Sequence, residues 1–386
     1  MNIRRILLVG DANSFLLNDI ALNIHNHSNN IQIDILNTNP TLDVLDKTIY
    51  SKILKPNVFR FGTQKLISQI NQYPAFFSMR FCIKSILKNI DKKYDVVHLH
   101  FFNKNFFYID ISYFKKISDK LLITFWGSDF FKRTDLQKNK MIPYLDAADQ
   151  IIFANPLMQQ NFLNHFNNYH HKTNILPFGL DIFNSIDNLI NDPNTSKEHI
   201  KKELGFDSKT VISIGYSSHP EQHQIEILQD IVQNIDKDTL QNIHFVLPLT
   251  YGDAEYTKRI IGTANALDLN YTALTSRMTK EAIAKVRYAS DIMVHLRDTD
   301  QFSGSFQEYL YTRNVVITGT WLPFGFLSED GLFLHTINKR SELFPLLKNV
   351  LCDIDSEYKK TEENPKILAK YSHWNMLIEK HISLYI

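Results

Sequence analysis

The chain is poor in cysteine and contains no long apolar run. Only two cysteines, Cys82 and Cys352, occur in 386 residues. They provide neither a disulfide framework nor the spacing of a metal site, which fits a reducing cytosol. No stretch approaches the roughly 20 apolar residues that cross a membrane. The opening residues, MNIRRILLVGDANS, predict a first β-strand rather than a signal peptide, so we expect a cytoplasmic protein.

The chain also has almost no net charge, because 42 Lys and Arg stand against 41 Asp and Glu. This balance indicates neither a nucleic-acid partner nor an acidic one. Residues 47–90 are the exception: they contain no Asp or Glu and place Arg80, Lys84 and Lys88 on one helical stripe. Such a basic, aromatic-rich region suits the anionic inner face of the plasma membrane. A solvated basic face and a nucleic-acid patch without an accompanying motif are the alternatives.

Apolar, β-rich runs alternate with helix-length segments along the chain. The runs are Ile6–Val9, Ile33–Leu36, Val96–Leu99, Leu121–Phe125, Ile151–Phe153, Val211–Ile214, Phe245–Leu247, Ile292–Val294 and Val315–Ile317. This alternation predicts parallel sheets with right-handed crossovers. The length of 386 residues and the hydrophobic content of 44% predict an α/β protein of two Rossmann-like domains that face a cleft.

Composition suggests where these domains meet. The polar segment 184–197, NSIDNLINDPNTSK, is typical of a linker. It separates a first domain at 1–183 from a second domain at 198–365. The last segment, 366–386, has the pattern of an amphipathic helix.

Residues 300–319, DQFSGSFQEYLYTRNVVITG, carry the strongest local signal. Asp300 and Glu308 flank the turn Ser303-Gly304-Ser305, which precedes a helix-length segment and a β-branched run. Free amides at a helix start beside a Ser/Gly turn form an anion site suited to a diphosphate. A carboxylate on the first turns can hold sugar or ribose hydroxyls. The alternative is an ordinary α/β loop with two solvated acids.

This acidic-x7-Glu spacing resembles an element of retaining glycosyltransferases with the GT-B fold, family 4 in particular. The segments TFWGSD at 124–129 and TNILPFGLD at 173–181 are also similar to that family. The resemblance implies that Glu308 contacts the nucleoside ribose and that Asp300 contacts the donor sugar. It also implies that the last helix returns to the first domain, which binds the acceptor.

The resemblance extends to the TFWGSD segment with one difference. Asp129 matches the family's acid, whereas Trp126 stands where the family often has a histidine near the reacting sugar. His98 and His100 end the preceding predicted strand on one face. We therefore take Asp129 and His100 as catalytic candidates with Asp300, and Trp126 as a residue lining the cleft.

The loop after the first predicted strand, Gly10–Ser14, lies where doubly wound sheets place ligand loops. It lacks Gly-x-Gly-x-x-Gly, which argues against a dinucleotide cofactor. We expect Asp11 and Asn13 to touch the donor or the acceptor instead.

The predicted start of the second domain departs from the family. Residues 211–224, VISIGYSSHPEQHQ, lack the Gly-Arg and the following Lys that bind donor phosphates. Together with FVLPLTYG at 245–252, this segment resembles bacterial 4-acetamido-4,6-dideoxygalactose transferases locally. We expect Arg297, Arg277 and His219 to supply the positive charge instead.

The resemblance as a whole implies a function. It implies transfer of a sugar from a nucleotide-sugar donor, with retention and without a metal or cofactor, to a glycan or polyprenyl-linked acceptor in bacterial surface polysaccharide synthesis. The donor sugar, its base and the linkage cannot be inferred from the sequence. A nucleotide-sugar 2-epimerase of the same fold and a catalytically inactive GT-B partner subunit are the alternatives.

Overall fold

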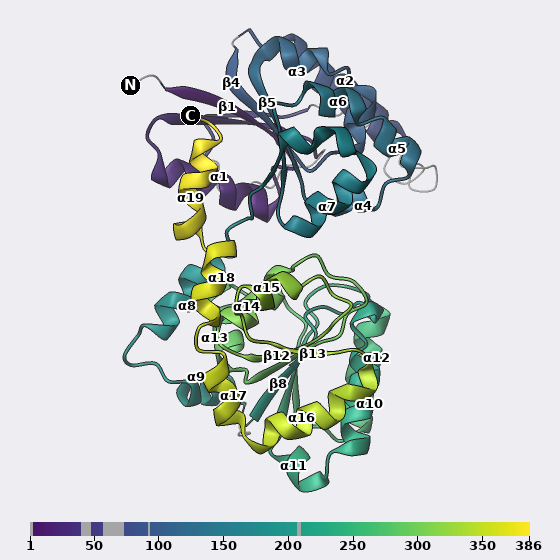
Figure 1. Cartoon of the computed structure of the whole chain (residues 1–386), viewed down its shortest axis with the longest axis vertical. Helices are drawn as coiled ribbons and strands as arrows, with labels where there is room; N and C mark the ends of the chain where they lie inside the picture. Colours follow the sequence, from purple (N-terminus) through teal and green to yellow (C-terminus); the bar gives the residue numbers. More distant parts are fainter. Residues whose placement is uncertain (1–2, 40–47, 57–72, 92, 207–209) are drawn as a thin grey trace, which may run out of the picture. The chain divides into compact units, whose positions relative to one another are not determined.

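The chain forms two compact units in the computed structural model (Figure 1). The structure describes residues 3–39, 48–56, 73–91, 93–206 and 210–386, without the side chains of 73–78. The first unit consists of Met1–Gly179 and Trp374–Ile386, and the second of Leu180–His373. Each unit is built around one parallel β-sheet.

The sheet of the first unit has the order β3-β2-β1-β4-β5-β6-β7 among the described residues. Its strands are β1 (Arg4–Gly10), β2 (Ile31–Asn37), β3 (Lys52–Leu54), β4 (Tyr94–His100), β5 (Ser118–Phe125), β6 (Gln150–Phe153) and β7 (Thr173–Ile175). Every neighbouring pair is parallel. The predicted apolar runs form the strand centres, which are buried as expected for a parallel sheet covered on both faces.

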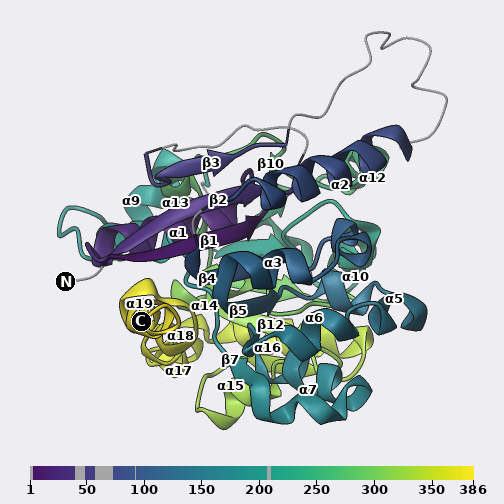
Figure 2. The ribbon, with the colours of Figure 1, turned by 90° about the horizontal axis from the view of Figure 1, so that it is seen from above.

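Helices connect these strands. They are α1 (Phe15–His27), α2 (Tyr73–Lys88), η1 (Lys104–Tyr108), α3 (Ser112–Ile117), α4 (Ser128–Phe131), α5 (Asp135–Asn139), α6 (Ile142–Ala147), α7 (Pro156–His165) and η2 (Asn167–Lys172). Polar caps fix several starts: Ser14 accepts a hydrogen bond from Leu17 N, and Asn155 accepts one from Met158 N. Helix α2 lies beside α3 (Figure 2).

The sheet of the second unit has the order β10-β9-β8-β11-β12-β13 among the described residues, again all parallel. Its strands are β8 (Thr210–Ile214), β9 (Ile243–Pro248), β10 (Tyr271–Leu274), β11 (Ile292–His295), β12 (Val315–Gly319) and β13 (His335–Ile337). Its helices are α8 (Ile182–Ile190), α9 (Lys197–Glu203), η3 (Pro220–Gln222), α10 (Gln224–Asn234), α11 (Lys237–Gln241), α12 (Ala254–Ala266), α13 (Lys280–Ala289), α14 (Gly304–Tyr311), α15 (Gly325–Glu329), η4 (Arg340–Glu342), α16 (Leu343–Cys352), α17 (Ile354–Lys360) and α18 (Asn364–Ser372).

Both sheets follow the same winding rule. The chain starts in a central strand, builds outward to one edge, and then returns to the other side of that strand. The strand order therefore reverses between β1 and β4 in the first unit and between β8 and β11 in the second. In doubly wound sheets, ligands bind beyond the carboxyl ends of the strands at such a reversal.

The structure corrects the predicted linker at 184–197. Residues 182–190 form α8 within the second unit, and the chain leaves the first unit already at Gly179. The Asn-rich composition suggested a loop, but Ile182, Phe183 and Ile186 are spaced for one helix face and are buried. Burial of that apolar stripe outweighs the weak helix propensity of the polar residues.

The last predicted helix, 366–386, is two helices in the structure. Helix α18 packs on α14 in the second unit, whereas α19 (Trp374–Ser383) packs on α1 (Figure 1). The predicted return of the last helix to the first domain is confirmed. A Cβ on Gly179 would lie 2.3 Å from the Trp374 ring, so only glycine fits where the chain leaves the first unit.

Candidate functional site

The two strand-order reversals carry many of the predicted site residues. In the first unit, Gly10 ends β1 and His100 ends the neighbouring β4. In the second unit, Gly215 follows β8 and His295 ends the neighbouring β11. His100 and His295 therefore occupy equivalent positions in the two sheets.

Asp300 is buried in the loop before α14, with 4% of its surface exposed. Its Oδ1 accepts a hydrogen bond from Ser303 N (2.8 Å), and its Oδ2 accepts bonds from Ser303 Oγ (2.8 Å) and Tyr216 OH (3.0 Å). His295 Nε2 lies 3.1 Å from the same Oδ2. Burial acts to raise the pKa of Asp300, but the contacts with His295 and Ser303 outweigh it, and the pKa is lowered. Asp300 and the Ser303 hydroxyl thus shape the loop in this structure. The sugar contact predicted for Asp300 and the phosphate contact predicted for Ser303 stay predictions.

The start of α14 lies where the sequence predicts an anion site, at Ser303-Gly304-Ser305. Ser303 occupies the N-cap position in an extended conformation, and the first backbone bond of the helix runs from Gln307 N to Ser303 O (3.2 Å). The amides of Gly304 and Ser305 precede that bond, at the positive end of the helix dipole. Gly304 and Ser305 are partly exposed, so a phosphate oxygen can approach them.

Glu308 lies one turn further along α14 and is held by a buried arginine. Its Oε2 accepts from Arg287 Nε at 2.9 Å, and its Oε1 lies 3.8 Å from where a Cβ on Gly304 would be. Arg287 also donates to Tyr309 OH (2.7 Å) and Ser305 Oγ (3.4 Å). Burial acts to lower the pKa of Arg287, but Tyr309 and Glu308 outweigh it and the pKa is raised. One oxygen of Glu308 is therefore fixed, and the other faces the helix start.

Sequence reasoning missed Arg287. It belongs to the apolar stripe of α13, where Ala284, Val286 and Ala289 are buried with it. A lone arginine in such a stripe is a usable signal, because a buried arginine needs an acidic or aromatic partner.

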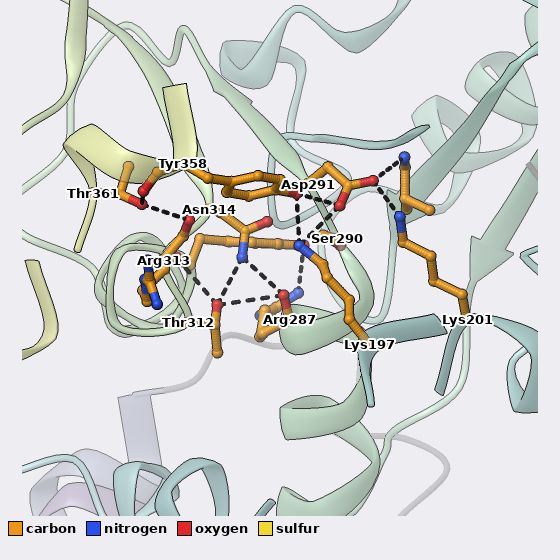
Figure 3. A network of polar contacts seen from close by, with 12 residues as sticks. Lys197, Lys201, Arg287, Ser290, Asp291, Thr312, Arg313, Asn314, Tyr358 and Thr361 are labelled. Carbon is orange, nitrogen blue, oxygen red and sulfur yellow. Dashed lines mark hydrogen bonds and ion pairs between the residues drawn. The ribbon is translucent and has the colours of Figure 1, made fainter. Parts of the chain in front are cut away.

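A polar network behind α13 fixes the backbone of Arg287 (Figure 3). The carbonyl of Arg287 accepts hydrogen bonds from Asn314 Nδ2 (2.8 Å) and Thr312 Oγ1 (3.3 Å). In the same view, Asp291 accepts from Lys201 Nζ (2.6 Å) and contacts Lys197 and Tyr358. The backbone amide of Val211 also donates to Asp291. The network stabilises the position of Arg287, which in turn holds Glu308.

Arg297 follows β11 and is already paired. Its Nη2 lies 2.9 Å from Glu221 Oε2, and its Nη1 donates to Tyr216 OH. Through Tyr216 it connects to Asp300. The Glu221 carboxylate is half-exposed, so a diphosphate can compete with it for the guanidinium.

The other two predicted cations are less connected. His219 begins η3, is partly exposed, and has its ring 6.2 Å from that of Tyr251. Arg277 is exposed in the loop between β10 and α13. Of the three cations, only Arg297 is brought to the Asp300 loop by contacts between described residues.

In the first unit, Asp129 is fully buried, and among the described residues its carboxylate accepts hydrogen bonds from backbone amides. Its Oδ1 accepts from Trp126 N and Gly127 N (2.9 Å each), and its Oδ2 accepts from Phe102 N (2.8 Å). Burial raises the pKa of Asp129 to about 6, although these amides act in the opposite direction. Asp129 thus joins the loops after β4 and β5, and its predicted catalytic role stays a prediction.

His100 and Trp126 lie at the same edge. His100 is buried, and within the described part of the chain neither of its ring nitrogens has a hydrogen-bond partner. Burial, reinforced by His381, lowers the pKa of His100 to about 3, so the ring is neutral. The Trp126 ring lies edge-on to His100 and to Phe178, with centroids 6.1 and 5.3 Å away. His100 and Trp126 therefore pack against each other, and Trp126 also packs against Phe178.

Asp11 and Asn13 lie in the loop after β1, partly exposed as expected for a ligand loop. Asp11 Oδ1 accepts from Asn13 N (2.9 Å), and Asp11 Oδ2 accepts from Asn39 Nδ2 (2.9 Å). The loop is therefore ordered by contacts between the ends of β1 and β2.

The predicted membrane stripe is partly occupied by neighbouring side chains. The Arg80 guanidinium lies 3.4 Å from the centroid of the Tyr108 ring, and Lys88 Nζ lies 5.9 Å from that of Tyr113. Lys84 interacts with the charge of Asp110, whose pKa is lowered chiefly by its hydrogen bonds with Ser112. The sequence pattern showed one charged stripe but could not show that η1 and α3 pack beside it. The central part of the acid-free region, 57–72, lies outside the described residues.

The described residues offer neither a metal cluster nor a membrane-spanning helix. No group of three or more His, Cys, Asp or Glu side chains there is placed to hold a metal ion. No helix there is long and apolar enough to cross a membrane.

Comparison with known proteins gives a family match over part of the chain and a fold over nearly all of it. Residues 5–155 match the family described as Glycosyl transferase 4-like. A glycosyltransferase from Rickettsia africae is similar over 100% of this chain and 98% of its own, with 14% identity and a TM-score of 0.75. Sucrose-phosphate synthase from Thermosynechococcus elongatus (99% and 98% covered, 13% identity, TM-score 0.71) and HepE from Anabaena in complex with UDP and glucose (99% of each, 13%, 0.70) are also similar. No curated protein matches the sequence significantly. The structural matches show that the predicted GT-B fold is correct.

Proposed function

We propose that the chain transfers a sugar from a nucleotide-sugar donor to an acceptor hydroxyl. Its GT-B fold and its glycosyl transferase 4-like match support a glycosyltransferase. The observation that carries the proposal is the arrangement at α14. There, the buried Arg287 fixes Glu308 one turn from the open amides of Gly304 and Ser305. HepE, which is similar in fold, is described in complexes with UDP and with UDP-glucose.

Each part of this arrangement has a role in the proposed reaction. The α14 amides and the helix dipole stabilise the negative charge that builds on the leaving diphosphate. Glu308 accepts hydrogen bonds from the ribose hydroxyls through its Oε1, because its Oε2 is held by Arg287. Arg297 adds positive charge once the diphosphate displaces Glu221, while Arg277 and His219 are further sources of charge.

Asp300 acts indirectly in this proposal. By accepting from Ser303 N, Ser303 Oγ and Tyr216 OH, it holds the turn that presents the α14 amides. It is a positioning residue, and its substitution is expected to impair donor binding by loosening that turn.

We further propose the finer features that the family resemblance implies. These are retention of configuration, independence of metal ions, and a glycan or polyprenyl-linked acceptor used in bacterial surface polysaccharide synthesis. The acid-free region 47–90 supports a cytoplasmic location at an anionic membrane surface. Each basic residue near such a surface contributes about 1 kcal/mol to the free energy of membrane binding. Binding to anionic liposomes that weakens as salt rises is the expected result, and no binding at low salt contradicts the membrane part.

The donor site is tested by calorimetric titration of UDP and other nucleoside diphosphates into the wild type, Glu308→Gln and Glu329→Gln. Glu329 is an exposed acid on α15, so its variant controls for loss of one charge. Glu308→Gln should weaken nucleotide binding by about 1.5–3 kcal/mol, as expected for a charge-assisted hydrogen bond, and Glu329→Gln should not. Equal affinity in all three proteins would refute the site.

Product analysis separates the alternatives. A transferase links the labelled sugar to an acceptor or, without one, slowly hydrolyses the donor. A non-hydrolysing 2-epimerase converts the nucleotide sugar into its 2-epimer without any acceptor and without net release of nucleotide. An inactive partner subunit does neither with any nucleotide sugar, which would contradict the proposal.

A further inference from the structure

The first unit contains a polar cavity at its strand-order reversal. The cavity has a volume of about 620 Å³ and is open to solvent. Its walls come from the loops that follow β1, β2, β4 and β5, and they include Asp11, Asn39, Phe101, Lys104 and Ser128. All of these residues belong to the first unit.

Positive charge predominates in this cavity. Lys104, Lys132 and Arg133 line it together with one acid, Asp11. Both carboxylate oxygens of Asp11 already accept hydrogen bonds within the loop, from Asn13 N and from Asn39 Nδ2. Lys104 and Lys132 are exposed and form no ion pair with other residues of the described chain. The excess of two positive charges matches a doubly charged anion.

Arg133 is held in place rather than left flexible. Its Nε donates to the carbonyl oxygen of Asp129 at 3.2 Å, which leaves its two terminal nitrogens for a ligand. Asp129 is fixed in turn by its three backbone amide donors. A held guanidinium loses less entropy on binding an anion than a mobile one.

Asn105 adds an unpaired acceptor to the wall. It is 5% exposed and lines the cavity, and its Oδ1 has no hydrogen-bond partner among the described residues. A buried amide oxygen without a partner is costly, and a ligand hydroxyl can donate to it. The cavity thus offers cations for an anion and an acceptor for a hydroxyl.

The loop that carries Lys104 and Asn105 begins with a strained residue. Phe101 has φ of 60°, a left-handed conformation that is unfavourable for an aromatic residue. Hydrogen bonds from Phe101 N to Thr124 O (3.1 Å) and from Phe102 N to Asp129 Oδ2 (2.8 Å) hold it there. Asp129 therefore supports both the strained turn and Arg133 on the cavity wall.

We infer that this cavity binds the phosphate group of the acceptor, with Lys104, Lys132 and Arg133 on the phosphate oxygens and Asn105 on a neighbouring hydroxyl. That the bound phosphate belongs to an acceptor rests on the proposed transfer reaction. Binding of a phosphate in this cavity does not depend on that reaction. A soluble sugar phosphate and a polyprenyl diphosphate share this chemistry.

The test is calorimetric titration of the full-length protein in the presence of excess UDP, which occupies the proposed donor site. The probes are glucose 1-phosphate and a short polyprenyl diphosphate, with glucose as the phosphate-free control and inorganic phosphate as the sugar-free control. The variants are Lys104→Gln/Lys132→Gln and the control Lys115→Gln/Lys116→Gln, which removes two exposed charges from α3. Since Arg133 also anchors a loop, the lysine pair is the decisive variant.

One or both phosphate probes should bind the wild type and the control, and should bind the cavity variant about tenfold more weakly. Glucose should not bind measurably. The probe that binds more tightly identifies the soluble or the lipid-linked source. Asn105→Ala should reduce the preference for glucose 1-phosphate over inorganic phosphate.

Equal affinity of the phosphate probes for the wild type and the cavity variant would overturn the inference, as would absence of binding by both probes. Failure of the proposed function is a different result, because it would leave UDP unbound or the nucleotide sugar unconverted. The phosphate titrations then still decide whether Lys104 and Lys132 form an anion site.

Discussion

His100 and His295 end equivalent strands of two similarly wound sheets, yet their surroundings differ. In the second unit, His295 lies 3.1 Å from Asp300, which also receives hydrogen bonds from Ser303 and Tyr216. In the first unit, His100 forms neither an ion pair nor a hydrogen bond within the described chain, and burial lowers its pKa to about 3. In the second unit, side chains surround and stabilise the buried charge of Asp300. In the first unit, the buried His100 ring is neutral.

The carboxylates of the two edges show the same contrast. Asp129 is bound by backbone amides, and its burial raises its pKa to about 6. Asp300 is buried to a similar degree, but its side-chain partners lower its pKa. The two units thus share a fold but differ in which groups offset the cost of burying polar side chains. We therefore expect their stabilities to respond differently to acid.

The largest expected effect is selective loss of the first unit in acid. His98, His100 and His381 have lowered pKa values because they are buried. Below the ordinary pKa of 6.5, the unfolded chain therefore binds protons that the native state does not, and stability falls as pH falls. Each histidine contributes up to about 1.4 kcal/mol per pH unit in this window.

Asp129 opposes this trend, because its raised pKa makes the native state bind a proton between about pH 6 and pH 4. One carboxyl group does not balance three rings. In the second unit, Asp291 and Asp300 have lowered pKa values, so their stabilising contribution is lost only as pH falls below the ordinary 3.8. Hydrogen exchange measured on peptides of each unit should show earlier opening of the first unit, and simultaneous opening would break the comparison.

The next largest effect is expected from Asp129→Ala. The change leaves three buried amide donors without an acceptor, at a cost of about 3 kcal/mol or more. Exchange should accelerate in peptides of the first unit and remain unchanged in the second. Asp119→Ala removes a well-exposed acid from β5 as the control, and equal effects of both changes would contradict the supporting role of Asp129.

In the second unit, Arg287→Lys tests whether Glu308 is held by the forked guanidinium. Lysine keeps the charge but cannot bond Glu308, Tyr309 and Ser305 together. UDP affinity should fall by about 1 kcal/mol, while Arg340→Lys, on the exposed η4, leaves it unchanged. Unaltered UDP affinity in Arg287→Lys would show that Glu308 does not need this partner.

The smallest expected effect on stability is that of Arg297→Ala. Its ion pair with Glu221 is partly exposed, and such pairs contribute about 0–1 kcal/mol. Binding of a nucleoside diphosphate should nevertheless weaken more than binding of the nucleoside. If both ligands weaken equally in calorimetry, Arg297 does not contact the phosphates.

The strands and α14 could be predicted from the sequence because they follow from local apolar patterns. The runs at 6–9 and 315–317 are buried strands, and the turn at 303–305 does begin a helix. The partners of buried polar groups could not be predicted in this way. Tyr216 reaches Asp300 across 84 positions, and Arg287 reaches Glu308 across 21. Such pairings depend on how separate elements close over one another, which residue spacing does not encode.

The position of α19 has a consequence for how the protein is made. The segment Trp374–Ile386 belongs to the first unit but is synthesised after the whole second unit. Until it emerges from the ribosome, His98 lacks its partner Tyr385, at 2.7 Å, and the surface against Gly179 is uncovered. Because domains generally fold as units during synthesis, the second unit is able to finish folding before the first. The half of the protein that is translated first is thus the last to be completed.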